Sequence, residues 1–146
     1  MKFAEFYVGQ VITAGPSTLS EQEILDFARQ WDPQWFHTDP EAAAQGPFGS
    51  LIASGWQTCG VAMRLACAAV LDGSEAYASP GVEKIRWPNP VRAGEPLSFR
   101  AEVLEIRRST KRAELGVLRW KWELFHADGR QALEMDATSL FKLPVD

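Results

Sequence analysis

The stretch SGWQTCGVAMRLACAAVL, residues 54–71, decides the fold. Its apolar residues recur at helical spacing and cover most of the opposite side too, where only Gln57, Thr58 and Arg64 are polar. A helix that is apolar nearly all round has to be enclosed by other parts of a protein. The longest apolar run, residues 61–71, contains Arg64 and is too short to span a membrane. The stretch therefore predicts a buried central helix and no membrane partner.

The second half of the chain contains the strands that we expect to cover the central helix. Its strand-like runs are residues 82–87, 97–107, 112–126 and 130–142, and a shorter one precedes them at 7–12. Asp128-Gly129, between the last two runs, is a strong hairpin signal. Long antiparallel strands beside a buried helix predict an α+β fold, in which a curved antiparallel sheet wraps around a long central helix.

Two helix starts precede the central helix. Ser20 opens a capping box in front of an apolar stripe, which predicts a helix over residues 21–31. Pro33 ends that helix, because it lacks an amide hydrogen and disfavours helical geometry in the residue before it. Asp39, followed by proline, predicts a second, short helix over residues 40–44.

Composition narrows the possible functions. A chain of 146 residues with 46% hydrophobic and 23% charged residues fits one globular domain, residues 1–146. A net charge of −4 and a pI near 5.2 argue against a nucleic-acid partner. Cys59 and Cys67 fit no metal or disulfide spacing, and the first ten residues show no signal peptide, so we expect reduced thiols and a cytoplasmic location.

The chain has two histidines, and they differ in context. His126 stands at a strand end before the hairpin turn, where we expect an exposed tip residue. His37 follows Asp32 by five residues, and a carboxylate and an imidazole that share a water can act as general base and general acid. On spacing alone a structural role is favoured, in which Asp32 caps a turn and His37 bonds to a backbone carbonyl.

Residues 47–56 lead from a glycine-containing loop into the start of the central helix. The N-terminus of a helix presents unpaired amide hydrogens and a partial positive charge. It can therefore hold the oxygen of a thioester as that oxygen becomes enolate-like, and Gly55 has no side chain to obstruct the approach. The alternative is that Gly55 only allows close packing against the sheet.

Together Asp32, His37 and Gly55 resemble the motif of the MaoC-like dehydratases and (R)-specific enoyl-CoA hydratases, a family with the hot-dog fold. The resemblance covers residues 7–143, including the order of helices and strands. The aspartate, the histidine five residues later and the glycine that opens the central helix all match. Two places differ: Gln34-Trp35 stand where the family has Asn-Pro, and Ser54 replaces a histidine often found before the glycine.

The resemblance implies reversible addition of water to a trans-2-enoyl thioester. Asp32 and His37 would hold the water, and the Gly55 amide would stabilise the thioester oxygen. The implied reaction needs no metal or redox cofactor. Coenzyme A, or acyl carrier protein, enters as part of the substrate. The expected substrate-binding residues, whose aromatic members suggest a pocket for a short or shaped acyl group, are Gln34, Trp35, Phe36, Phe48, Ser54 and Trp56. Candidate cations for the phosphates of coenzyme A are Lys84, Arg86, Arg92, Arg107, Arg108, Lys111 and Arg112.

Two other functions stay open. A hot-dog acyl-CoA thioesterase would carry a carboxylate on or near the central helix, but no acid precedes Asp72 there. A non-catalytic module that binds acyl thioesters would show binding without turnover. Hot-dog proteins commonly pair strand edges between two subunits, so we expect a homodimer, with Trp120 and Trp122 either at its interface or in the core.

Overall fold

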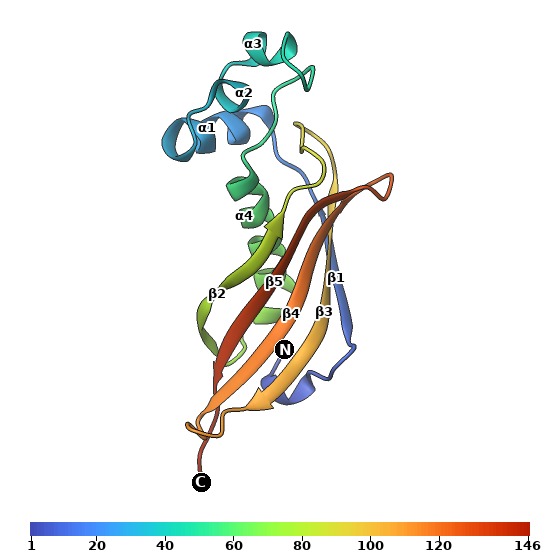
Figure 1. Ribbon diagram of the computed structural model, residues 1–146. Helices are drawn as coiled ribbons and strands as arrows, with labels where there is room; N and C mark the ends of the chain where they lie inside the picture. Colours follow the sequence, from blue (N-terminus) through green and yellow to red (C-terminus); the bar gives the residue numbers. More distant parts are fainter.

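The computed structural model describes residues 1–146 and contains one antiparallel sheet of five strands (Figure 1). The strands lie in the order β1-β3-β4-β5-β2, so β1 and β2 form the two edges. Their bounds are β1 Val11–Ser17, β2 Ala76–Arg86, β3 Leu97–Arg108, β4 Leu115–His126 and β5 Gln131–Lys142. The predicted antiparallel α+β architecture is confirmed.

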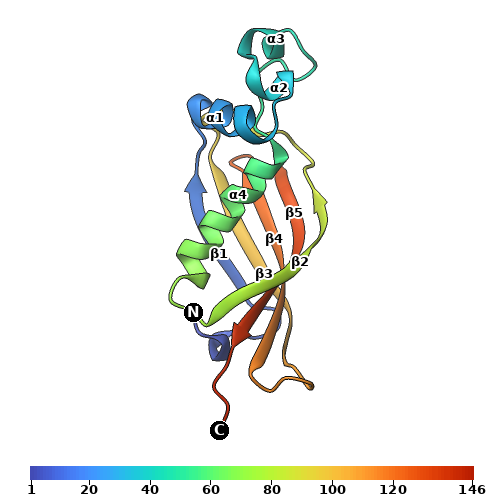
Figure 2. The same ribbon diagram turned by 90° about the vertical axis from the view of Figure 1, so that its left-hand side faces the viewer.

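One long helix, α4 (Gly55–Ala66), crosses a face of the curved sheet and continues into a π-helical turn, Cys67–Leu71 (Figure 2). Three shorter helices gather beyond one end of the sheet, near the hairpin that joins β4 to β5 (Figure 1). They are α1 (Glu21–Trp31), α2 (Trp35–Thr38) and α3 (Pro40–Ala44), and a 3-10 turn, Phe3–Glu5, lies near the N-terminus. None of the helices is both long enough and apolar enough to cross a membrane.

The predicted helix caps are confirmed. The Ser20 side chain and Glu23 close a capping box at the start of α1. The Asp39 carboxylate accepts a hydrogen bond from the backbone amide of Ala42, with Pro40 as the first residue of α3. These local signals depend on residues within one helical turn, which is why the sequence alone locates both helix starts.

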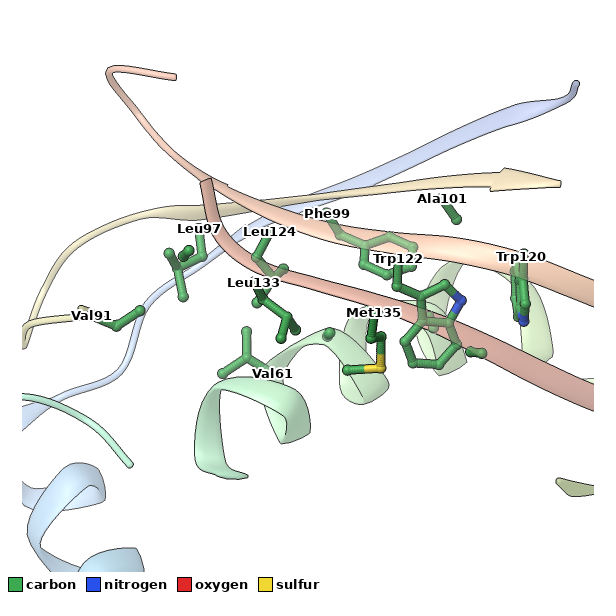
Figure 3. Close-up of a cluster of buried hydrophobic side chains, with 14 of the residues drawn as sticks. Val61, Val91, Leu97, Phe99, Ala101, Trp120, Trp122, Leu124, Leu133 and Met135 are labelled. Carbon is green, nitrogen blue, oxygen red and sulfur yellow. The ribbon is translucent and has the colours of Figure 1, made fainter. Parts of the chain in front are cut away.

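The core lies between the sheet and α4 (Figure 3). Alternate side chains of β3 point toward the helix, because successive side chains of a strand face opposite sides. In Figure 3, Val61 of α4 points toward Leu133 of β5. Trp120 and Trp122 are buried in this layer, and the Trp120 indole donates a 3.2 Å hydrogen bond to the Ser139 hydroxyl. Of the two places considered for them, a subunit interface or the core, the structure therefore shows the core.

Helix α4 is covered on one side only. Val61, Ala62 and Ala66 face the sheet and are buried. On the other side Trp56 is 59% exposed and Met63 is 43% exposed. The prediction that the rest of the chain encloses this helix is therefore wrong for a single chain, because one sheet covers only one face of a helix.

Strand boundaries differ from the predicted ones at the starts of β1, β2 and β4; β4 begins at Leu115 rather than at residue 112, because residues 113–114 form a turn. β1 begins at Val11 rather than at residue 7, because residues 7–10 form a turn closed by the Gln10 amide and the Tyr7 carbonyl. β2 begins at Ala76, well before residue 82, although Pro80-Gly81 is typical of a turn. β2 accommodates both residues through shifts in its register with β5, as an edge strand can.

His126 is 5% exposed, so the expectation of an exposed tip residue is wrong. It ends β4 opposite Leu97 of β3, and its imidazole Nδ1 lies 3.7 Å from a carboxylate oxygen of Glu95. The turn that precedes β3 places Glu95 beside the end of β4, and this contact between distant segments cannot be read from the position of His126 relative to the hairpin.

We expect the Leu124→Ala variant to lose about 2–5 kcal/mol of unfolding free energy, because Leu124 is fully buried between β4 and α4. The matched surface change Val11→Ala, on an exposed position of β1, should cost less than about 0.5 kcal/mol. Urea unfolding measures both values. Equal losses in the two variants would contradict the described core.

Candidate active site

Asp32 and His37 meet at the junction between α1 and α2. Asp32 is the residue that ends α1, and Pro33 follows it. His37 lies within the single turn of α2 rather than on an irregular loop, and that turn brings its ring back over Asp32. The imidazole Nε2 is 3.3 Å from Asp32 Oδ2, and the two side chains are 6% and 15% exposed.

Two polar side chains fix the Asp32 carboxylate. The Ser54 hydroxyl donates a 2.7 Å hydrogen bond to Oδ2, and the Gln34 amide donates a 2.8 Å hydrogen bond to Oδ1. Burial acts to raise the pKa of Asp32, but these two hydrogen bonds and the neighbouring His37 outweigh it and hold that pKa below its usual value. Asp32 is therefore ionised near neutral pH and acts as a hydrogen-bond acceptor.

The His37 ring has one nitrogen fixed by the backbone. Its Nδ1 lies 2.7 Å from the carbonyl oxygen of Ile52, which can only accept a hydrogen bond, so Nδ1 carries the hydrogen. The other nitrogen, Nε2, faces Asp32 and is the atom that can exchange a proton. The structural role considered for His37, a bond to a carbonyl, is thus present, and it orients the imidazole without occupying Nε2.

Gly55, the first residue of α4, lines a cavity of about 220 Å³ together with His37 and Phe48. We call this space the catalytic cavity. As the first helical residue, Gly55 has no carbonyl within the helix for its amide to bond. The α-carbon of Gly55 is covered by Trp87, because a β-carbon there would lie 2.5 Å from the indole. Gly55 therefore does allow close packing, but against Trp87 rather than against a strand.

The remaining predicted binding residues fall into two groups. Gln34 and Ser54 contact Asp32, Phe36 packs on the His37 ring at a centroid distance of 4.4 Å, and Phe48 lines the catalytic cavity. Trp35 instead packs on Phe36 and is half exposed, and Trp56 lines a different cavity. The expectation that the four aromatic residues line one pocket is therefore wrong, because only Phe48 of the four lines the catalytic cavity.

Sequence reasoning missed one wall of the catalytic cavity, which the segment after β2 supplies. This wall is Trp87, Pro88, Asn89, Pro90 and Val91. The Asn89 side-chain amide donates a 2.8 Å hydrogen bond to the Gln131 carbonyl, which ties the segment to β5. The sequence signal was available, since two prolines within four residues indicate a fixed, extended segment, but nothing local shows what it faces.

Arg92, a predicted phosphate ligand, forms hydrogen bonds within the protein instead. Its guanidinium donates hydrogen bonds of 2.8 Å to the Ser50 hydroxyl and 2.9 Å to the Phe48 carbonyl. These bonds hold the loop before α4 against the catalytic cavity.

The other candidate cations stand away from the Asp32–His37 pair or beside acidic residues. Lys84 and Arg86, on β2, form ion pairs with Asp136 and Glu134 at 3.8 Å and 3.0 Å. Arg107, Arg108, Lys111 and Arg112 surround the turn between β3 and β4, at the end of the sheet opposite α2 (Figure 1). The structure does not bring these predicted phosphate contacts to the site. It also gathers no group of three or more histidine, cysteine or acidic side chains that could hold a metal ion.

Comparison with known sequences agrees with this geometry. The family model described as "MaoC like domain" matches residues 5–119. The chain is 35% identical over 118 residues to an uncharacterized protein of Bacillus subtilis, covering 81% of this chain and 82% of that one. It is 39% identical over 79 residues to 3-hydroxyacyl-thioester dehydratase Z of Mycobacterium tuberculosis, a match that covers 53% of this chain and 52% of that protein.

Solved structures show the same architecture. A MaoC-like dehydratase from Rhodospirillum rubrum superposes with a TM-score of 0.87 at 31% identity, covering 97% of each chain. An (R)-hydratase from Pseudomonas aeruginosa superposes with a TM-score of 0.74 at 25% identity, covering 97% of this chain and 86% of that one. The fold is the hot dog, as the sequence predicted.

The Ser54→Ala variant removes both the N-cap of α4 and a hydrogen bond to Asp32. We expect it to lose about 1 kcal/mol of unfolding free energy from the cap alone. The folded-state pKa of Asp32 lies below the unfolded value, so ionised Asp32 contributes stability above the unfolded value of about 3.9, and this is lost as pH falls through the folded pKa. The destabilisation should therefore be larger at pH 7 than at about pH 2.

Urea unfolding across this pH range tests the expectation. Ser139→Ala is the matched control, because Ser139 is also buried but bonds to the indole of Trp120, which does not titrate. Its destabilisation should be the same at both pH values. A Ser54→Ala effect that does not change with pH would show that Ser54 does not stabilise the charged form of Asp32.

Proposed function

Because the chain belongs to the MaoC-like dehydratase family, we propose that it is a hydro-lyase that adds water reversibly across the double bond of a trans-2-enoyl thioester. One observation carries the proposal: Asp32 and His37 lie 3.3 Å apart, and His37 lines one cavity with the first residue of α4. Similarity to a 3-hydroxyacyl-thioester dehydratase and to an (R)-hydratase supports the same chemistry.

The hydrogen bonds around the two side chains favour His37 as the group that carries the proton. Since Nδ1 donates to the Ile52 carbonyl, the neutral ring presents a lone pair at Nε2. Nε2 takes a proton from the bound water as the water oxygen attacks the β-carbon of the substrate. The same proton is then returned to the α-carbon. The O–H bond of water and the π bond of the C=C are broken, and one C–O and one C–H bond are formed. Asp32, whose lowered pKa keeps it ionised, orients the water and stabilises the imidazolium.

The start of α4 stabilises the charge that develops on the thioester oxygen. Attack at the β-carbon moves electrons onto that oxygen, which becomes enolate-like. The Gly55 amide and the positive end of the α4 dipole border the cavity where this oxygen would lie. The chemistry uses no metal or redox cofactor, and coenzyme A or acyl carrier protein is part of the substrate.

A thioesterase function receives less support from the site. Its water would need a carboxylate on or near the central helix, and α4 contains no acidic residue. The carboxylate that does approach the helix is Asp32, and it is paired with the His37 imidazole at 3.3 Å, as the hydratase proposal requires. The arrangement therefore favours hydration over hydrolysis.

We expect Asp32→Asn and His37→Gln each to lower kcat for enoyl-thioester hydration by about 10²- to 10⁴-fold, since each removes half of the acid–base pair. Matched controls are Asp26→Asn, on the exposed side of α1, and His126→Gln, at the other histidine. Both controls should retain activity within a few fold. The assay follows loss of the enoyl-thioester absorbance while free thiol is measured in parallel.

Each other outcome of this assay points to a different function. Thiol release that persists in Asp32→Asn would indicate a thioesterase with another water-activating group. Binding of enoyl-CoA without loss of absorbance or release of thiol would indicate a non-catalytic module. Either result would refute the proposed hydratase.

We further propose that the protein is a homodimer joined through edge strand β2. That edge is unpaired, and apolar side chains beside it, including Tyr77, Val82 and Trp56, are about half exposed. Light scattering should give a molar mass near twice 16.3 kDa. Val82→Lys should shift the protein toward the monomer, whereas Val11→Lys on the opposite edge should leave the dimer intact. A wild-type mass of one chain would contradict the proposal.

A further inference from the structure

Two cavities lie along the same helix. The catalytic cavity is bordered by His37 and Gly55 at the start of α4. A second cavity, of about 290 Å³, lies farther along α4, against β5 and β2. We call it the apolar cavity, because its lining is dominated by indole, thiol, thioether and aliphatic groups, among them Trp56, Cys59, Met63, Val82, Trp122 and Met135. It offers a methylene chain apolar contacts and no charged partner.

Trp87 lies between the two cavities. Its indole covers the α-carbon of Gly55 on one side and lines the catalytic cavity. Gly55 and Cys59 are four residues apart and therefore lie on the same face of α4. The Cys59 thiol lines the apolar cavity; burial raises the pKa of this thiol, and the neighbouring Trp87 side chain partly offsets that rise. The indole thus lies between the catalytic cavity, which it lines, and two residues that line the apolar cavity, Trp56 and Cys59.

Trp56 holds the Trp87 ring in this position. The two indoles pack edge to face, with their centroids 5.4 Å apart and their planes at 78°. Such aromatic pairs contribute favourably beyond the area that they bury. Displacing the Trp87 ring would break this contact and the contact with Gly55 together.

We propose that Trp87 sets the acyl chain length of the substrate, by closing the catalytic cavity to the apolar cavity. The inference rests on the proposed hydratase function and names the substrate class within it: enoyl thioesters with short acyl chains. A longer chain has no path from the thioester along α4 unless the indole is removed. Truncation of Trp87 joins the two cavities and gives each added methylene group apolar contacts.

The size of the effect follows from the burial of methylene groups. Each buried methylene is worth about 0.8 kcal/mol, or about fourfold in kcat/KM. A C8 chain has four more methylenes than a C4 chain, and burial of only two of them changes the ratio by more than tenfold. We therefore expect the C8-to-C4 ratio of kcat/KM to rise at least about tenfold in Trp87→Ala, and by less in Trp87→Phe.

The experiment compares trans-2-enoyl-CoAs of C4, C6, C8 and C10 with the wild type, Trp87→Ala and Trp87→Phe. Trp31→Ala is the control, since Trp31 is an exposed tryptophan at the end of α1, away from both cavities. It should leave the ratio unchanged. Trp87→Phe keeps a ring beside Gly55 and covers the case in which Trp87→Ala does not fold.

A second measurement does not depend on turnover. The rate at which a thiol reagent alkylates Cys59 is measured by mass spectrometry in the presence of saturated butyryl-CoA or decanoyl-CoA. In Trp87→Ala, decanoyl-CoA should protect Cys59, because its chain enters the apolar cavity, and butyryl-CoA should not. In the wild type neither ligand should protect Cys59.

The outcomes separate this inference from the proposed function. If the wild type hydrates no substrate of any chain length, the hydratase proposal is refuted. The protection of Cys59 from alkylation would still test whether Trp87 separates the two cavities. The inference is overturned by a wild type that hydrates C8 and C10 substrates as efficiently as C4, by an unchanged ratio in both Trp87 variants, or by decanoyl-CoA that protects Cys59 in the wild type.

Discussion

The 2.7 Å hydrogen bond from Ser54 to Asp32 joins the two halves of the site. Asp32 ends α1, and Ser54 is the buried N-cap of α4, so the bond links the small helices to the helix that packs on the sheet. Two residues before Ser54, the Ile52 carbonyl fixes the His37 ring. The segment that starts the central helix therefore also orients both members of the proposed acid–base pair, and any shift of α4 on the sheet moves the site with it.

The one-sided packing of α4 explains where ligands can bind. The sheet buries the face that carries Val61 and Ala66, and this burial anchors the helix. The adjoining face, with Gly55 and Cys59, is covered only in part by the segment after β2, which leaves the two cavities on either side of Trp87. In the proposed function, the helix held on one face by the sheet presents its N-terminus to the thioester, and the single side chain of Trp87 sets the length of the acyl pocket.

Local sequence signals located most of the fold, and contacts distant in sequence account for the errors. The capping box at Ser20, the cap at Asp39 and the Asp128-Gly129 turn each act within a few residues, so they can be recognised without a structure. The spacing of Asp32 and His37 alone favoured a structural role, and the start of the central helix drew attention to Gly55; the family resemblance then identified all three as candidate catalytic residues. The burial of His126, the early start of β2 and the position of Trp87 over Gly55 depend on partners far along the chain, which no local pattern encodes.

The central claim is that the pair formed by Asp32 and His37 adds water across a double bond and leaves the thioester intact. Incubating trans-2-butenoyl-CoA with the protein in H₂¹⁸O and, separately, in D₂O, followed by mass spectrometry of the product, tests it most directly. Hydration predicts an intact 3-hydroxyacyl thioester with one ¹⁸O at the β-carbon and one deuterium at the α-carbon. Release of free coenzyme A with ¹⁸O in a carboxylic acid, or recovery of unlabelled substrate, would contradict it.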